Sequence, residues 1–281
     1  MDEVPFFPQQ DYQCGPAALA TMLTQRGIDT GPEQLVERVY LPGRKGSLQV
    51  EMVAAARSHD LLVYPLEPRL EALLAEVAAG NPVLVLQNLA FDSWPQWHFA
   101  VVVGYDLSNQ TIVLRSGTTR RWTGSFRQFE RSWAKGDRWA MVTVMPDQLP
   151  QTAKETVWLK AANDLEQTGR IDAALQAYET AAEHWSGGLS WFALANSWYA
   201  QGDKRAAESA LRTSIQRDVS FAAGWFNLSQ VLAERGCTVQ SSKARACAVR
   251  LAPKDERFAA ELSAGQGEAA ACEAPPPCPV H

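Results

Sequence analysis

A tryptophan and a glycine recur together three times in the second half of the chain. The three tryptophans are separated by 33 and 34 residues, and a glycine follows each of them eleven residues later. These residues are Trp158, Trp191 and Trp225, followed by Gly169, Gly202 and Gly236. A glycine at this distance suits the turn between two antiparallel helices, and a fixed period of this length is typical of stacked helical pairs. The alternative that the pattern leaves open is an unrelated helical bundle.

Other positions keep the same register. Leu194 and Leu228 match in the first helices, Ala174 and Ala207 match in the second helices, and Pro253 closes the third unit. The pattern resembles the tetratricopeptide repeat (TPR), and the resemblance covers 154 to about 253. It implies an all-α TPR solenoid that binds a protein partner on its concave face. With `DERFAAEL` as a capping helix, we expect three TPR repeats over 154–262.

The first half of the chain mixes two hydrophobic periods. Helical spacing runs through 16–26, 32–40, 47–59 and 69–79, and strand-like runs follow in `DLLVYPL`, `PVLVLQ`, `HFAVVVGY`, `TIVLRS` and `RWAMVTVM`. Helices first and strands later predict an α+β domain, with N-terminal helices packed on an antiparallel sheet. Two prolines in `MPDQLPQ` predict a boundary, which divides the chain into a domain at 1–147, a linker at 148–153 and the helical repeats.

The C-terminal segment 263–281 is rich in Ala, Pro and Gly and has no apolar face, which predicts a disordered tail. Cys272, Cys278 and His281 have side chains that can bind a metal ion, but a fourth ligand is missing, so no metal site is predicted. Cys237 and Cys247 would be about 15 Å apart on a continuous helix, too far for a disulfide unless the chain folds back at Cys237.

Charge and hydropathy exclude several classes of protein. The formal net charge is −5 and the pI is near 5.5, so no nucleic acid partner is expected. No apolar run reaches the roughly 18 residues of a membrane span, and `MDEVPFF` lacks the features of a signal peptide. The sequence as it stands predicts a cytoplasmic protein. The cell envelope or periplasm is the alternative if an N-terminal signal has been removed.

The stretch `PQQDYQCGPAALATML` places Cys14 at the start of an apolar helix. Pro16 is preorganised for the first helical turn, so the thiol is expected at the positive end of the helix dipole, where the thiolate is favoured. A catalytic thiol also needs a base. His98 opens the strongly apolar strand `HFAVVVGY` and is the best placed of the four histidines. The alternative is a small buried cysteine.

The order of Gln, Cys at a helix start and His on a later strand resembles the papain superfamily. `VPFFPQQDYQCGPAALATML` and `WHFAVVVGYD` are similar to the bacteriocin-leader (double-glycine) peptidase family of bacteria, over about residues 4 to 145. The resemblance implies Cys14 as nucleophile and His98 as general base and acid. It also implies a glutamine just upstream of the cysteine as oxyanion donor. Gln9 is the best match, ahead of Gln10 and Gln13.

The sequence departs from the family pattern at the residue that orients the imidazole, for which the family uses Asp or Asn on the strand after the histidine. Asp106 lies about 26 Å from His98 along the same strand. A hairpin around `DLSNQ` would instead bring Ser116 opposite His98. A hydroxyl there can accept from Nδ1–H, but it stabilises the imidazolium less than a carboxylate would.

Basic and aromatic side chains surround this expected site. Arg115 and Arg120 are candidates for binding an acidic group of the substrate, and Trp97 for a wall of the cleft. The function predicted from the sequence is a cysteine peptidase without a cofactor, acting on a protein or peptide substrate. The alternatives are a transpeptidase or amidase on the same fold, and an inert scaffold.

Overall fold

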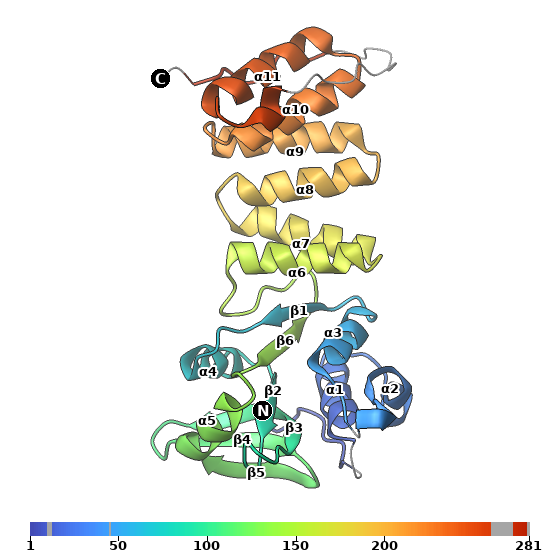
Figure 1. Ribbon diagram of the computed structural model, residues 1–281, viewed down its shortest axis with the longest axis vertical. Coiled ribbons are helices and arrows are strands. Elements are labelled where there is room, and N and C mark those ends of the chain that lie inside the picture. Colours follow the sequence, from blue (N-terminus) through green and yellow to red (C-terminus); the bar gives the residue numbers. More distant parts are fainter. Residues whose placement is uncertain (10–12, 45, 260–271, 280–281) are drawn as a thin grey trace. The chain divides into compact units, whose positions relative to one another are not determined.

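The computed structural model describes residues 1–9, 13–44, 46–259 and 272–279. The chain forms two compact units, Met1–Ala174 and Leu175–His281, and each is described here by itself (Figure 1).

The first unit is built on a six-stranded sheet whose neighbouring strands are all antiparallel. The strand order is β1-β6-β2-β3-β4-β5. The bounds are β1 (Leu62–Pro65), β2 (Val83–Asn88), β3 (Trp97–Asp106), β4 (Thr111–Ser116), β5 (Thr119–Ser125) and β6 (Ala140–Val144). The five apolar runs of the sequence form five of these strands, as predicted. The sixth, β5, is mostly exposed and polar, so it lacks the apolar pattern on which the prediction depended.

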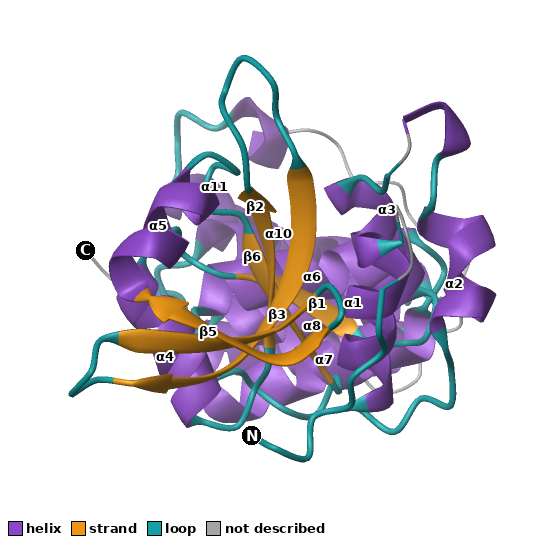
Figure 2. Cartoon of the chain, turned by 90° about the horizontal axis from the view of Figure 1, so that it is seen from below, coloured by secondary structure: helices purple, strands orange, loops and turns teal. Residues whose placement is uncertain are grey.

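Helices cover both sides of this sheet (Figures 1 and 2). On one side lie α1 (Cys14–Thr24), α2 (Pro32–Val39) and α3 (Gln49–Arg57), with the short 3-10 turn η1 (Pro42–Arg44) between the last two. On the other side lie α4 (Leu70–Ala78) and α5 (Phe126–Ala134). The four helices expected at 16–26, 32–40, 47–59 and 69–79 are therefore confirmed, and the predicted α+β architecture with them.

Helix α1 is buried almost all round, since every residue from Gly15 to Leu23 is inaccessible to solvent. Its side chains share one apolar core with β3 and α3, including Leu19, Phe99 and Met52. A helix that is apolar on all faces has to lie inside the domain. The chemistry at its first residue is consequently fixed by packing along the whole helix.

The stretch 148–153, predicted as a linker, is bound to the first unit. Glu76 is fully buried, and its carboxylate accepts from the backbone N–H groups of Gln151 and Thr152 and from the Thr152 hydroxyl. The Tyr64 hydroxyl donates to the Thr152 carbonyl and accepts from the Lys154 N–H. These bonds hold the beginning of α6 (Glu155–Gln167), which packs against β1.

The remaining helices are α7 (Ile171–His184), which spans the division between the units, α8 (Leu189–Ala200), α9 (Lys204–Arg217), α10 (Ala222–Glu234) and α11 (Thr238–Leu251). Together with α6, they form the pairs α6–α7, α8–α9 and α10–α11. Gly169, Gly202 and Gly236 lie in the turns α6–α7, α8–α9 and α10–α11, with φ of 79°, 85° and 82°. The left-handed conformation explains the glycines, because other residues adopt it at a cost. The predicted glycine turns are therefore confirmed.

The segment predicted as a capping helix begins as a short 3-10 turn, η2 (Glu256–Ala259), and its last three residues lie outside the described part. Phe258 is buried in this turn, and its ring packs against Phe226 of α10 at a centroid distance of 5.1 Å. The turn thus closes the core of the second unit.

Residues 272–279 differ from the expected disordered tail, because two disulfides join them to the second unit. Cys237 pairs with Cys272 and Cys247 pairs with Cys278. The alternative of a Cys237–Cys247 bond is therefore wrong. Neither tail cysteine has a thiol left for a metal ion, and His281, the third ligand type considered, lies outside the described residues.

Candidate active site

Cys14 is the first residue of α1, where the helix leaves backbone N–H groups unpaired. Three N–H groups interact with its sulfur: those of Gly15, of Cys14 itself and of Phe99 on β3. The last of these matters most for function, because Phe99 directly follows His98. It places the thiol beside the strand that carries the candidate base.

The start of α1 also needs a small residue. A Cβ built on Gly15 would lie 2.1 Å from the Ser47 hydroxyl oxygen and 2.5 Å from the Ser47 Cβ. The segment before α3 therefore passes directly over the first turn of α1. Gly15 is explained by this close approach, and the sequence alone gave no signal that Ser47 would be its neighbour.

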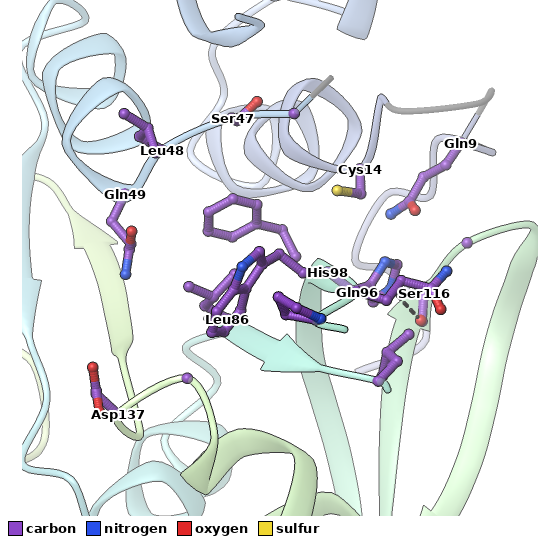
Figure 3. A pocket seen from close by; sticks show the side chains of 17 residues that line it. Gln9, Cys14, Ser47, Leu48, Gln49, Leu86, Gln96, His98, Ser116 and Asp137 are labelled. Carbon is purple, nitrogen blue, oxygen red and sulfur yellow. Dashed lines mark hydrogen bonds between the residues drawn. The ribbon is translucent and has the colours of Figure 1, made fainter. Parts of the chain in front are cut away.

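A cleft of about 1160 Å³ opens in front of Cys14 (Figure 3). Segments far apart in the sequence line it: the residues before α1, the start of α3, the β2–β3 loop, the β4–β5 turn and the turn after α5. Among the lining residues are Gln9, Cys14, Ser47, Gln49, Trp97, His98, Ser116 and Asp137. The cleft is a suitable size for several residues of a peptide.

His98 and Ser116 are hydrogen-bonded, at 2.8 Å between Nε2 and Oγ (Figure 3). The predicted proximity of these side chains is therefore confirmed, but two details differ. The bond uses Nε2 and not Nδ1. The strand register places Arg115 opposite Val101, with an irregularity between Val102 and Gly104, so the predicted pairing of His98 directly opposite Ser116 is wrong by two positions. Ser116 reaches His98 diagonally across the two strands.

Burial has the largest influence on the pKa values of Cys14 and His98. It lowers the pKa of His98 to about 4. Burial also raises the pKa of the Cys14 thiol, and the three N–H groups at the sulfur offset only part of that effect. This direction is opposite to the favoured thiolate expected from the helix terminus, because desolvation outweighs the helix terminus. Burial therefore favours the neutral form of both groups in the free protein.

Gln9 lines the same cleft, on the Cys14 side of His98 and Ser116 (Figure 3). Its backbone N–H donates to the Gly117 carbonyl at 3.1 Å. Gly117 follows Ser116 in the β4–β5 turn and has a φ of 59°, a conformation that suits glycine. One turn thus holds the expected oxyanion donor and the partner of His98. Gln10, another of the upstream candidates, lies outside the described residues.

Asp106 lies at the opposite end of β3 from His98. Its carboxylate accepts from the backbone and side chains of Ser108 and Asn109, and these bonds lower its pKa to about 2. The carboxylate therefore fixes the β3–β4 turn. The expectation that Asp106 does not reach His98 is confirmed.

Of the three predicted substrate-binding residues, only Trp97 lines the cleft, with 52% of its surface exposed. Arg115 is 4% exposed, and its guanidinium donates to the carbonyls of Met1, Asp2, Val4 and Arg120. Arg120 also donates to the Asp2 carbonyl. Both arginines hold the N-terminal segment in place, so the structure gives no support for a substrate contact by either.

Some cleft residues have no counterpart in the sequence prediction. Leu48 and Gln49 come from the beginning of α3, and Gly136 and Asp137 from the turn after α5. A Cβ on Gly136 would lie 2.5 Å from the Leu86 carbonyl oxygen, so this turn packs tightly against β2. Neither segment carries a sequence motif, and only the fold brings them to the cleft.

Comparison with known families decides where this arrangement belongs. Residues 1–141 match the model of the Peptidase_C39 like family, about half of the chain, and they include Gln9, Cys14, His98 and Ser116. The chain belongs to the Peptidase_C39 like family. At family level this membership supports a cysteine peptidase. The Peptidase_C39 like match ends before α6 and does not extend to the paired helices.

Two solved structures are similar to the same half of the chain. A protein from Bacillus anthracis described as a C39-like peptidase is 19% identical and covers 51% of this chain and 96% of its own, with a TM-score of 0.43. The peptidase domain of Streptococcus ComA, described as a bi-functional ABC transporter in quorum sensing, is 17% identical, with coverages of 50% and 98% and a TM-score of 0.42. A search of curated proteins finds no match.

Within the described residues, none of the helices combines the length and the apolar character that a membrane crossing requires.

Proposed function

We propose that this chain is a cysteine peptidase in which Cys14 attacks the scissile carbonyl, His98 transfers protons, Gln9 stabilises the oxyanion and Ser116 orients His98. The observation that carries the proposal is the pairing at the cleft. The N–H of Phe99 interacts with the Cys14 sulfur, and the neighbouring His98 has its Nε2 held by Ser116. Nδ1 therefore remains for the thiol.

Because burial favours the neutral form of both groups in the free protein, we propose that the proton moves when the substrate is bound. Nδ1 of His98 takes the thiol proton as Sγ bonds to the carbonyl carbon. The N–H of Cys14 and the amide of Gln9 donate to the resulting oxyanion. The C–N bond breaks as His98 protonates the leaving amine. Water then attacks the thioester with His98 as base, which releases the acid and restores the thiol.

A thiol-directed probe tests the nucleophile cleanly. The chain has five cysteines, and four of them form disulfides, so Cys14 is the single free thiol. A peptide carrying an electrophile should label the native protein once, at Cys14, and Cys14→Ala should abolish labelling and peptide cleavage. His98→Ala should keep the thiol but abolish cleavage. Cleavage that survives in Cys14→Ala would overturn the proposal.

The same assay separates the alternatives. An inert scaffold would show no cleavage and no enhanced reaction with a peptide electrophile relative to a simple alkylating agent. A transpeptidase would give a ligated product when an amine acceptor is added, and an amidase would release ammonia from a side-chain amide.

We also propose that α6 to α11 are three TPR repeats that bind the substrate protein or a partner. The 34-residue period and the glycine turns support this. In the second unit the first helices of the pairs are α8 and α10. The Asn227 side chain on α10, which is half-buried, donates to the exposed Asn196 side chain on α8. Replacing both with Asp should raise KM for a protein substrate and leave cleavage of a short peptide unchanged. Equal effects on both substrates would contradict this role.

A further inference from the structure

The C-terminal strap (residues 272–279) lies along α11, and two disulfides fix its conformation. The Cα–Cα distances are 5.6 Å for Cys237–Cys272 and 5.8 Å for Cys247–Cys278. Ten residues separate the two cysteines at α11, a rise of about 15 Å along a helix. Six residues separate those of the strap, which span about 19 Å as polyproline II but only about 9 Å as a helix. Only an extended strap matches the spacing, and Pro275, Pro276 and Pro277 favour that conformation.

Side chains of α9 and α11 recognise the backbone of this extended segment. Arg212 donates to the carbonyls of Glu273 and Ala274, at 2.8 and 2.7 Å. Gln240 donates to the Cys272 carbonyl at 3.3 Å, and Arg250 to the Pro279 carbonyl at 2.9 Å. Prolines have no N–H, so a proline-rich segment offers acceptors, and these three side chains supply donors.

An ion pair with Glu208 holds the Arg212 side chain in position. Its guanidinium pairs with Glu208, and the same carboxylate also pairs with Arg235 of the α10–α11 turn. The side chains of Arg212 and Glu208 are only 12% and 8% exposed. Two guanidinium groups thus share one buried carboxylate, so the site carries a net positive charge. Glu273 of the strap is the acidic residue that complements it.

The strap contacts the second helix of each pair, α9 and α11. The partner surface proposed above uses the first helices, α8 and α10. The two surfaces therefore use different helices, and the recognition at α9 and α11 is a separate property of the second unit.

We propose that α9 and α11 form a binding surface for an extended, proline-rich peptide with an acidic residue, that the C-terminal strap occupies it in cis, and that its two disulfides control access. Each disulfide opens when a dithiol gives up two electrons and two protons and becomes a disulfide itself, so two equivalents yield four thiols. Where disulfides persist, the surface is closed. Where dithiols reduce them, the strap can leave and an acidic, proline-rich segment of another protein can take its place.

The test uses the full chain and a synthetic peptide of residues 272–279 with serine at both cysteine positions. Binding is followed by NMR, through the side-chain N–H signals of Arg212 and Arg250. The oxidised protein should not respond to the peptide. The reduced protein, and the full-length variant Cys272→Ser with Cys278→Ser, should bind it at millimolar concentration. The strap competes in cis at an effective concentration on the order of millimolar, so the titration must exceed that level.

Two comparisons test the recognition itself. A peptide with alanines in place of its three consecutive prolines should bind the serine variant several-fold more weakly, because it loses the preorganised extended conformation. Arg250→Gln should weaken binding, and Lys243→Gln on the same helix serves as its control. Equal response of the oxidised and reduced proteins, or no response of either opened form above the effective concentration, would overturn the proposal. A thermal melt by circular dichroism shows whether each opened form remains folded.

Discussion

Replacing Ser116 with Asp would test how the imidazole is oriented and charged. His98 now has a neutral hydroxyl at 2.8 Å from Nε2 and a pKa lowered by burial to about 4. A carboxylate about 4 Å from the ring would stabilise the imidazolium by about 4 kcal/mol at an effective dielectric of 20. That energy corresponds to about three pKa units, so the pKa of His98 should rise to about 7.

The assay is an NMR titration of His98 combined with the pH profile of kcat/KM. In Ser116→Asp the imidazole should titrate near neutral pH, and Cys14 should react with iodoacetamide faster at pH 6 than in the wild type, because an imidazolium stabilises the thiolate. Ser116→Asn is the matched control, since it has the same shape without the charge and should leave the pKa of His98 below 5.

The sign of the effect on stability is also defined. A raised pKa of His98 in the folded protein adds stability below the unfolded value near 6.5, and this contribution is lost as the pH rises through about 7. Above that pH the new carboxylate lies near a neutral ring, so Ser116→Asp should be less stable than Ser116→Asn. A pKa of His98 that is equal in the Asp and Asn variants would refute the geometry, because the carboxylate would then not face the ring.

Three further predictions concern the thiol, the N-terminal segment and the start of α1. In the wild type, the rate of Cys14 alkylation by iodoacetamide should show no plateau between pH 5 and 8 and should still increase above pH 9. The reason is that burial raises the pKa of the thiol above its ordinary 9.0. A rate that is constant from pH 5 upward would show a preformed ion pair. Arg115→Met should lower the free energy of unfolding by about 2–4 kcal/mol in urea melts, because four backbone carbonyls lose a buried donor. The control Arg121→Gln removes an exposed ion pair with Asp2 and should change the free energy of unfolding by less than about 0.5 kcal/mol. Equal effects of the two substitutions would contradict the role of Arg115. Gly15→Ala should cost about 1–3 kcal/mol through its overlap with Ser47, and adding Ser47→Gly should restore most of the loss; no rescue would mean that the overlap is not the cause.

The sequence predicted the elements whose signal lies in their own residues. The buried strands and α1 are apolar because the fold covers them, and Cys14 and His98 carry chemistry that few other positions could supply. The strand β5 was not predicted, because its residues are mostly polar and exposed. The helix α5 was also not predicted, although its buried Phe129 and Trp133 lie at helical spacing. The proximity of Ser116 and His98 was predicted from an incorrect strand register. The two side chains still meet, because they contact each other diagonally across the strands, and no sequence pattern indicates the irregularity in the register.

Arg115 and the four C-terminal cysteines show what a local interpretation leaves out. Arg115 was interpreted as a candidate for binding an acidic group of the substrate, because nothing in `TIVLRS` indicates that residues 1–4 will cover it. The cysteine spacings did contain a signal, since ten residues of helix and six of extended chain have similar lengths. Considering pairs between the helix and the proline-rich tail would have suggested the disulfides from the sequence.

The bond from the Gln9 N–H to the Gly117 carbonyl joins two parts of the site that have different roles in the proposed mechanism. There, Gln9 stabilises the charge of the intermediate, and Ser116, next to Gly117, orients His98, which carries the proton. A substitution that shifts this turn would therefore slow acylation and deacylation in parallel. It follows that grafting Gln9 or Ser116 onto another scaffold should require the β4–β5 turn to be grafted with them, because one backbone hydrogen bond connects the two positions.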